Sequence, residues 1–223
     1  MGKLIVIEGS DGTGKATQSK KIISKLKRLG MRVRFLDFPQ YGTPSCGPVE
    51  KYLNGTYGDT DSITAYQASL LYAVDRFDAS FKLKKWLKEG AIVIANRYVT
   101  SNLAHQGCKI KNPKKRREFF KWVNNLEYNV FKIPRPVANL ILYMPVELSH
   151  QLIGHKKSRK YLKGKKRDLH EANIRHLRCA SDTYLELAKT YPREYKIINC
   201  YRRRLLSRNE IFELIWEKIK KII

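Results

Sequence analysis

The stretch Leu4-Ile-Val-Ile-Glu-Gly9-Ser-Asp-Gly-Thr-Gly14-Lys15-Ala16-Thr17 decides the fold of this chain. It opens with a β-branched apolar run, which is typical of a strand buried on both faces. After Lys15, apolar residues recur at helical spacing over residues 22–29, and Gly30 is a natural end for that helix. A strand, a glycine-rich turn and a helix in this order predict a phosphate-binding loop.

The turn supplies the groups that hold a phosphate. Glycines let backbone N–H groups crowd around phosphate oxygens, Lys15 reaches the terminal phosphates, and the helix offers its positive N-terminal end. We therefore expect a phosphate site made by Ser10, Asp11, Gly12, Thr13, Gly14, Lys15, Ala16 and Thr17. Position 16 departs from the usual pattern, because alanine lacks the hydroxyl that holds Mg²⁺ there.

Four further strands are predicted, over about residues 32–38, 91–95, 139–144 and 195–199. Helical patterns separate them. The pattern over residues 64–88 carries Leu70, Val74, Phe77 and Phe81, and the pattern over residues 209–223 carries Ile211, Ile215 and Ile219. Ser207 with Glu210 predicts a capping box for the last helix.

Strands that alternate with helices predict an α/β fold, with a five-stranded parallel sheet and helices on both faces. Ligands of such sheets bind at the carboxyl ends of the strands. Asp11, Phe38 and Arg97 all stand at these ends. We therefore expect the functional site there.

The bulk properties limit the class of protein. A length of 223 residues suits one sizeable domain, so we expect a single domain over residues 1–223. Cys46, Cys108, Cys179 and Cys200 form no CxxC pair, which predicts neither a zinc site nor a disulfide framework. No apolar run is long enough for a signal peptide or a membrane span. We expect a cytoplasmic protein with reduced thiols and no membrane partner.

Lysine and arginine number 45 against 20 acidic residues, which gives a formal charge of +25. Such an excess suits a polyanionic partner, whether nucleic acid, an anionic membrane surface or a phosphorylated substrate. The basic residues are spread along the chain, and a lysine-biased proteome would give the same total. Nucleic acid is not an expected partner, because the sequence shows no basic arm, recognition helix or aromatic-interleaved strand face.

Five clusters in sequence order resemble the thymidylate (dTMP) kinases, a family of P-loop nucleoside monophosphate kinases. The clusters are Gly9–Lys15, Phe38–Gly42, Tyr72–Arg76, Arg97–Asn102 and Asp168–Glu171. Their order and spacing match from the first residue to about Leu187. The resemblance implies a three-layer P-loop kinase fold with a lid, and the ATP-dependent phosphorylation of dTMP to dTDP with Mg²⁺ as cofactor.

The resemblance also implies a role for each matched residue. Lys15 and Arg97 would be catalytic and hold phosphates, since a guanidinium fork suits phosphate oxygens. Tyr72 would stack on thymine, and Arg76, one helical turn later, would hydrogen-bond the edge of the base. The further substrate residues implied are Asp11, Phe38, Pro39, Tyr41, Ser101, Asn102, His105, Asp168 and His170.

Several of these residues also have a simpler interpretation. Tyr72 could belong to the core, and Arg76 could form a surface ion pair with Asp75 of little consequence. Asp168 and Glu171 could be acidic residues in the first turn of a helix. The combination with the phosphate loop favours the functional interpretation, most of all for Arg76, Arg97 and Asn102.

A basic segment, residues 155–167, holds eight lysines or arginines. It corresponds to the mobile lid of the family, at about residues 150–170, which closes over ATP. Arg159 and Arg167 are the candidates for stabilising the charge on the transferring phosphoryl group. A solvated basic loop is the alternative.

The chain departs from the family pattern at positions that the resemblance assigns to the metal ion and to the sugar of the substrate. Ala16 lacks a hydroxyl, and Asn96 replaces the aspartate that precedes Arg97 in the family. Mg²⁺ needs only one or two carboxylates, so Asp11 and Glu171, with help from Glu8, could still hold it. His105 and His170 stand where close relatives often carry tyrosine, which bears on sugar discrimination.

The sequence is compatible with three functions. The first is a dTMP kinase, for which the resemblance implies a homodimer with the helix from about Thr64 in its interface. The second is a catalytically weak or inactive nucleotide-binding relative, which Ala16 and Asn96 favour. The third is a nucleic-acid-binding NTPase, which only the net charge favours. We expect the kinase, with ATP and dTMP as its ligands.

Overall fold

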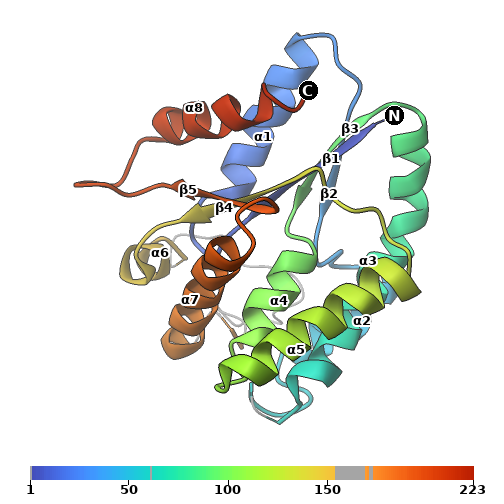
Figure 1. Cartoon of the computed structure of the whole chain (residues 1–223), viewed down its shortest axis with the longest axis vertical. Coiled ribbons are helices and arrows are strands. Elements are labelled where there is room, and N and C mark those ends of the chain that lie inside the picture. The colour runs from blue at the N-terminus through green and yellow to red at the C-terminus, as the bar shows by residue number, and fades with distance from the viewer. Residues whose placement is uncertain (1, 61, 154–168, 171–172) are drawn as a thin grey trace.

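The computed structural model describes residues 2–60, 62–153, 169–170 and 173–223. Its centre is a five-stranded parallel sheet with the strand order β2-β3-β1-β4-β5 (Figure 1). The strands are β1 (Lys3–Glu8), β2 (Val33–Asp37), β3 (Ile92–Asn96), β4 (Ala138–Tyr143) and β5 (Tyr195–Asn199). Each agrees with its predicted span to within one residue at either end. The predicted α/β class is confirmed.

Helices connect successive strands. They are α1 (Lys15–Arg28), α2 (Gly47–Leu53), α3 (Ala65–Lys88), α4 (Val99–Gly107), α5 (Pro113–Asn124), α6 (Val146–Ile153), α7 (Ile174–Thr190) and α8 (Arg208–Ile219), with a 3₁₀ turn η1 (Pro44–Cys46) and a π-helical turn η2 (Asn125–Val130). Within the described ranges, none of these helices combines the length and apolarity that a membrane crossing requires.

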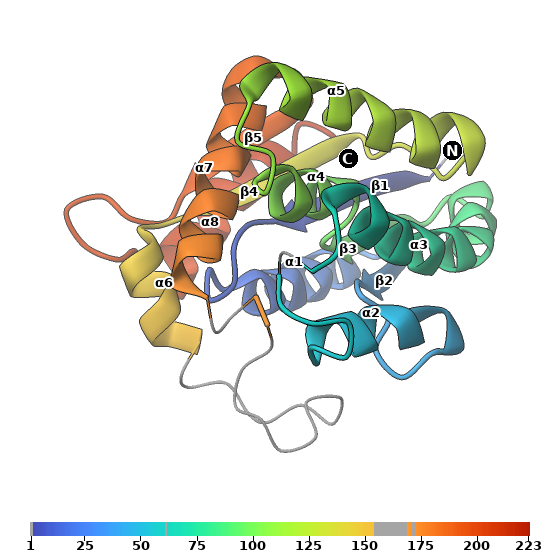
Figure 2. The same cartoon turned by 90° about the horizontal axis from the view of Figure 1, so that it is seen from below.

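The two faces of the sheet explain why β1 is an unbroken apolar run. Leu4 and Val6 pack on one face with α3, α4, α5 and α7, whereas Ile5 and Ile7 pack on the other with α1 and α8. Figure 1 and Figure 2 show the helices in layers on either side of the strands. Successive strand side chains point to opposite faces, so a central strand covered on both sides must be apolar throughout.

Strand register brings the chemistry to one edge of the sheet. Ile7 of β1 lies opposite Asn96 of β3, and Asn96 lies opposite Asp37 of β2. The phosphate loop after β1, Arg97 after β3 and Phe38 after β2 therefore leave three adjacent strands at the same end. This is the edge at which parallel sheets bind their ligands.

Side-chain caps fix where two helices begin. Thr64 and Gln67 form a capping box at the start of α3. Ser207 and Glu210 form another at the start of α8, as predicted. In each box, the hydroxyl and the longer side chain satisfy backbone N–H groups that the first helical turn leaves unpaired.

The apolar residues that marked α3 in the sequence are its exposed ones. Leu70, Val74, Phe77 and Phe81 keep 42%, 46%, 37% and 63% of their surface exposed. Most of the buried residues of α3 are small, and they include Ala68, Ser69, Ala73, Ala79 and Ser80. Small side chains let this helix pack closely, and its larger apolar residues remain as a stripe on the surface.

Candidate active site

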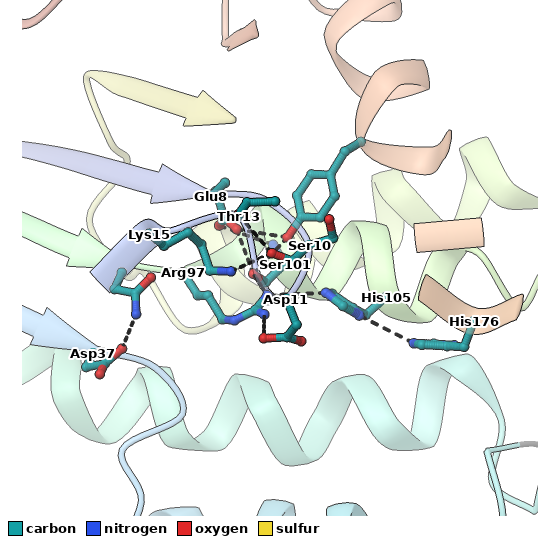
Figure 3. A network of polar contacts seen from close by, with 12 residues as sticks. Glu8, Ser10, Asp11, Thr13, Lys15, Asp37, Arg97, Ser101, His105 and His176 are labelled. Atoms are coloured by element: carbon teal, nitrogen blue, oxygen red, sulfur yellow. Dashed lines mark hydrogen bonds and ion pairs between the residues drawn. The ribbon is translucent and has the colours of Figure 1, made fainter. Parts of the chain in front are cut away.

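The phosphate loop occupies the turn between β1 and α1. Gly12 has a φ of +85°, and a Cβ atom there would lie 2.0 Å from the carbonyl oxygen of Ser149. The loop can therefore adopt its path only with glycine at this position. The Nζ atom of Lys15 donates to the carbonyl oxygen of Ser10 at 2.8 Å, and the Thr13 hydroxyl donates to the same oxygen at 2.9 Å (Figure 3).

A cavity of about 780 Å³ opens beside this loop at the carboxyl ends of the strands. It brings together most of the residues that the sequence analysis selected. Its predicted lining residues are Asp11, Gly12, Thr13, Gly14, Lys15, Ala16, Thr17, Phe38, Pro39, Tyr41, Tyr72, Arg76, Arg97, Ser101, Asn102, His105 and His170. Ser10 is buried under the loop and takes part through its carbonyl oxygen.

Arg97 links the loop to the end of β3. Its guanidinium donates to Asp11 Oδ1 at 2.8 Å and to the Ser101 hydroxyl at 3.1 Å, and lies 3.2 Å from His105 Nε2 (Figure 3). Burial alone would lower the pKa of Arg97, but Asp11 reverses this, and the pKa lies well above its usual value. Its φ of +64° is unusual for a non-glycine residue, at a cost of about 1–3 kcal/mol.

Glu8 anchors the start of α4 from beneath. One carboxylate oxygen accepts from the backbone N–H groups of Tyr98 and Ser101, and the other from the hydroxyls of Ser101 and Tyr184. Burial raises the pKa of Glu8, and these hydrogen bonds oppose that rise. Because both oxygens are engaged with α4 and α7, Glu8 does not fit the supporting metal role considered for it.

Asn96 and Asp37 form a pair at the edge of the cavity. Asn96 Nδ2 donates to Asp37 Oδ1 at 2.6 Å. Burial raises the pKa of Asp37, and the hydrogen bond from Asn96 opposes that rise. Asp37, the last residue of β2, was not among the predicted site residues, although it lies near the end of a predicted strand. The replacement at position 96 therefore leaves a carboxylate next to it, supplied by the neighbouring strand.

Arg76 lies in the wall of the cavity and is bound by Glu127. Arg76 Nε donates to Glu127 Oε2 at 2.6 Å, and Arg76 Nη2 to Oε1 at 2.5 Å, with both side chains almost fully buried. The alternative of a surface pair with Asp75 is wrong, because Asp75 instead accepts from the backbone N–H of Gln40. Glu127 belongs to η2, and no local sequence pattern marked it.

Two amide side chains complete this wall. Asn102 Nδ2 donates to the Ser69 carbonyl oxygen at 3.3 Å, but Asn102 Oδ1 is buried without a hydrogen-bond partner among the described residues. The same holds for both polar atoms of the Gln106 side chain. Buried polar atoms are normally satisfied, so three atoms without a partner among the described residues set this wall apart from the ordinary core. Sequence analysis missed Gln106.

Tyr72 is partly buried and lines the cavity, with its ring in an edge-on contact with Tyr52. Beside it, the chain turns at Phe38 and Pro39, and Tyr41 keeps 39% of its surface exposed. These residues add aromatic surface to the lining of the cavity.

Four predicted residues lie outside the described part of the chain. They are Arg159, Arg167, Asp168 and Glu171. His170 is described, is buried, and lies 3.0 Å through Nε2 from the hydroxyl of Tyr52. Leu205, Leu206 and Arg208 add lining that the sequence did not point to, and the Arg208 carbonyl oxygen accepts from Gln18 of α1.

Comparisons with known proteins agree with this geometry. The family model described as thymidylate kinase matches residues 7–211. The thymidylate kinase of Mycobacterium tuberculosis is 29% identical over 186 residues, which cover 83% of this chain and 85% of that protein. The thymidylate kinase of Bifidobacterium longum is 26% identical over 226 residues, covering 100% and 97%.

A solved structure shares the fold. The thymidylate kinase of Candida albicans superimposes with a TM-score of 0.73 at 20% identity, covering 99% of this chain and 92% of that one. The family match spans the phosphate loop, the Arg97 segment and the polar wall of the cavity. The chain belongs to the thymidylate kinase family of phosphotransferases.

Proposed function

We propose that this protein transfers the γ-phosphoryl group of ATP to dTMP and releases dTDP and ADP. The observation that carries the proposal is one cavity that joins a phosphate loop to a polar wall with three unsatisfied atoms. An oxygen of the dTMP phosphate attacks the γ-phosphorus in line, the bond to the β,γ-bridging oxygen breaks, and ADP leaves with that electron pair.

The phosphate end of the cavity supplies positive charge. The loop amides and Lys15 hold the β- and γ-phosphates of ATP, and Lys15 follows the group in transfer. Arg97 lies across the loop, and its fork contacts the acceptor phosphate. Because phosphoryl transfer depends mainly on placement and charge neutralisation, two fixed cations on one cavity suit this reaction.

The opposite end recognises the base. Tyr72 stacks on thymine, while Phe38 and Pro39 shape the deoxyribose pocket and Tyr41 donates to the monophosphate. Thymine presents two carbonyl acceptors and one N–H donor on its edge. Asn102 and Gln106 line the cavity, and a side-chain amide carries both a donor and an acceptor, the two kinds of group that pair with such an edge.

The residues present fit Mg²⁺ through oxygen ligands. Asp37 and Asn96 line the cavity with oxygen-bearing side chains, and Asp11 stands in the loop. Glu171 is a further candidate from the sequence. Bound Mg²⁺ would neutralise phosphate charge, and the substrate phosphates and waters would complete its shell in place of a hydroxyl at position 16.

We also propose a homodimer and a cytoplasmic location. The exposed stripe of Leu70, Val74, Phe77 and Phe81 on α3 supplies an apolar surface of the kind that subunit interfaces bury. All four cysteines are free thiols, which suits a reducing compartment.

The activity is tested with a coupled assay of ADP release across a panel of nucleoside monophosphates, with Mg²⁺ titrated. We expect turnover with dTMP, and a loss of about a hundredfold or more in Lys15→Ala. Lys20→Ala, an exposed lysine of the same helix, is the control and keeps the activity. Nucleotide binding with no turnover above Lys15→Ala would identify an inactive relative instead.

The Arg76–Glu127 pair is tested by Glu127→Gln. Removing one partner leaves a buried cation, so we expect a loss of about 3–5 kcal/mol in unfolding free energy. The KM for dTMP should rise about tenfold, as expected for roughly 1.4 kcal/mol of lost binding. The KM for ATP should barely change.

Glu147→Gln is the matched control, because Glu147 forms an exposed ion pair with Arg178. We expect this variant to match the wild type in denaturant unfolding and in kinetics. Equal effects of the two substitutions would contradict the role given to the buried pair.

The metal arrangement is tested by Asn96→Asp. A second carboxylate beside Asp37 should lower the Mg²⁺ concentration for half-maximal activity by about tenfold. Ala16→Ser, which adds the missing hydroxyl, should act in the same direction. An unchanged Mg²⁺ dependence in both variants would show that these positions lie outside the metal shell.

The dimer is tested by sedimentation velocity of the double variant Val74→Glu with Phe81→Glu. Two charges on the apolar stripe should convert a dimer to a monomer at the same protein concentration. Val137→Glu is the control, because Val137 is 54% exposed and belongs to the loop before β4, outside the stripe on α3. A wild-type monomer would refute the proposed assembly.

A further inference from the structure

Three histidines gather at one side of the cavity. His105 of α4, His170 and His176 of α7 are all buried, and one ring nitrogen of each lies within 4.8 Å of the others. His105 and His170 line the cavity, while His176 lies behind them. The rings of His170 and His176 are stacked, with centroids 4.2 Å apart.

Burial keeps these imidazoles neutral. It lowers the pKa of His105 and His170 well below the usual value, and it lowers the pKa of His176 to about 4. Each ring therefore keeps an unprotonated nitrogen at neutral pH, and a neutral imidazole nitrogen is a metal ligand. The cluster offers three such ligands within a small volume.

We propose that His105, His170 and His176 bind a divalent transition metal ion, with Zn²⁺ as the representative, and that this binding inhibits the enzyme. Three imidazoles are a ligand set that suits Zn²⁺, Co²⁺, Ni²⁺ and Cu²⁺, and not the oxygen-preferring Mg²⁺. The binding step stands by itself, whereas the inhibition rests on the proposed kinase function.

The spacing of two nitrogens already suits coordination. His105 Nδ1 and His176 Nε2 are 3.3 Å apart. Two ligand nitrogens about 2.05 Å from a tetrahedral zinc ion lie about 3.3 Å from each other. A metal ion would replace the proton that these two nitrogens share. His170 offers a ring nitrogen within 4.8 Å of the other two ligand atoms, and its ring must turn from its stack on His176 for that nitrogen to reach a shared ion.

Two of the three outer nitrogens, those of His176 and His170, have polar neighbours that can orient metal-bound histidines. His176 Nδ1 lies 3.7 Å from the Cys108 thiol, and His170 Nε2 lies 3.0 Å from the Tyr52 hydroxyl. Lys109 Nζ in turn donates to that hydroxyl at 2.9 Å. Contacts of this kind fix the orientation of ligating rings.

Arg97 connects the cluster to catalysis. Its Nη1 lies 3.2 Å from His105 Nε2, which accepts when His105 carries its proton on Nδ1. A metal on Nδ1 moves the imidazole proton to Nε2, so two donors then face each other. Arg97 loses this support, and the guanidinium that contacts the acceptor phosphate shifts. The expected effect is a lower kcat.

The surrounding charges set the strength of the site. Arg97 and Lys109 are cations beside the cluster, and Asp11 is the nearby anion. We therefore expect weaker affinity than at zinc sites with thiolate or carboxylate ligands, and reversible occupancy.

The binding test is equilibrium dialysis of the full chain against buffered free Zn²⁺, with Co²⁺ absorption as a second readout. We expect one equivalent of metal per chain and visible ligand-field bands typical of a nitrogen-ligated, low-coordinate Co²⁺ ion. His176→Phe keeps the ring but removes the ligand, and should weaken binding at least about tenfold. His176→Asn serves if the first variant does not fold.

His150→Ala is the matched control, because His150 lies on α6 outside the cluster. It should bind metal as the wild type does. In the kinase assay at saturating Mg²⁺, Zn²⁺ should inhibit the wild type and His150→Ala, and His176→Phe should resist. Equal metal binding by wild type and His176→Phe would overturn the site, whatever the kinase assay shows. Binding without inhibition would overturn only the coupling.

Discussion

The ion pair between Arg97 and Asp11 joins the end of β3 to the phosphate loop, and the geometry of the site depends on it. Arg97 adopts a left-handed backbone conformation that its own side chain does not favour. The 2.8 Å contact with Asp11 and the hydrogen bond to Ser101 hold it there. Glu8 fixes Ser101 and the start of α4 from below. A strained arginine is thereby held in the lining of the cavity, beside the phosphate loop.

Buried charges in this protein are organised in local pairs, independently of the excess of +25. Arg97 pairs with Asp11 and Arg76 with Glu127, while Glu8 and Asp37 are each satisfied by neutral donors. An unpaired buried charge would cost several kcal/mol, so each is matched where it stands. The surplus of lysine and arginine therefore belongs mainly to the surface and says little about the site.

Local patterns made the sheet and the phosphate loop predictable. The apolar runs of β1 and β3 and the glycine spacing of residues 9–14 carry their structure within a few residues. The site, in contrast, is built from contacts between residues that are far apart in the sequence. Glu127 pairs with Arg76 across 51 positions, and Asp37 meets Asn96 only through the register of β2 and β3. From the sequence, Asn96 indicates the loss of a carboxylate. The structure shows that the neighbouring strand supplies one through Asp37, which is distant in sequence.

The histidine cluster is the clearest example of a site that cannot be predicted from short stretches of sequence. Taken one at a time, His105 and His170 are histidines at positions where relatives often carry tyrosine, and they indicate only a change in sugar discrimination. The contact of His105 with His176 spans 71 positions and exists only because α7 packs against α4. The Arg97 guanidinium contacts Asp11 of the phosphate loop and His105 of α4, and His105 in turn contacts His176 of α7. Since His176 is not among the lining residues of the cavity, we expect a change there to act on Arg97 through His105.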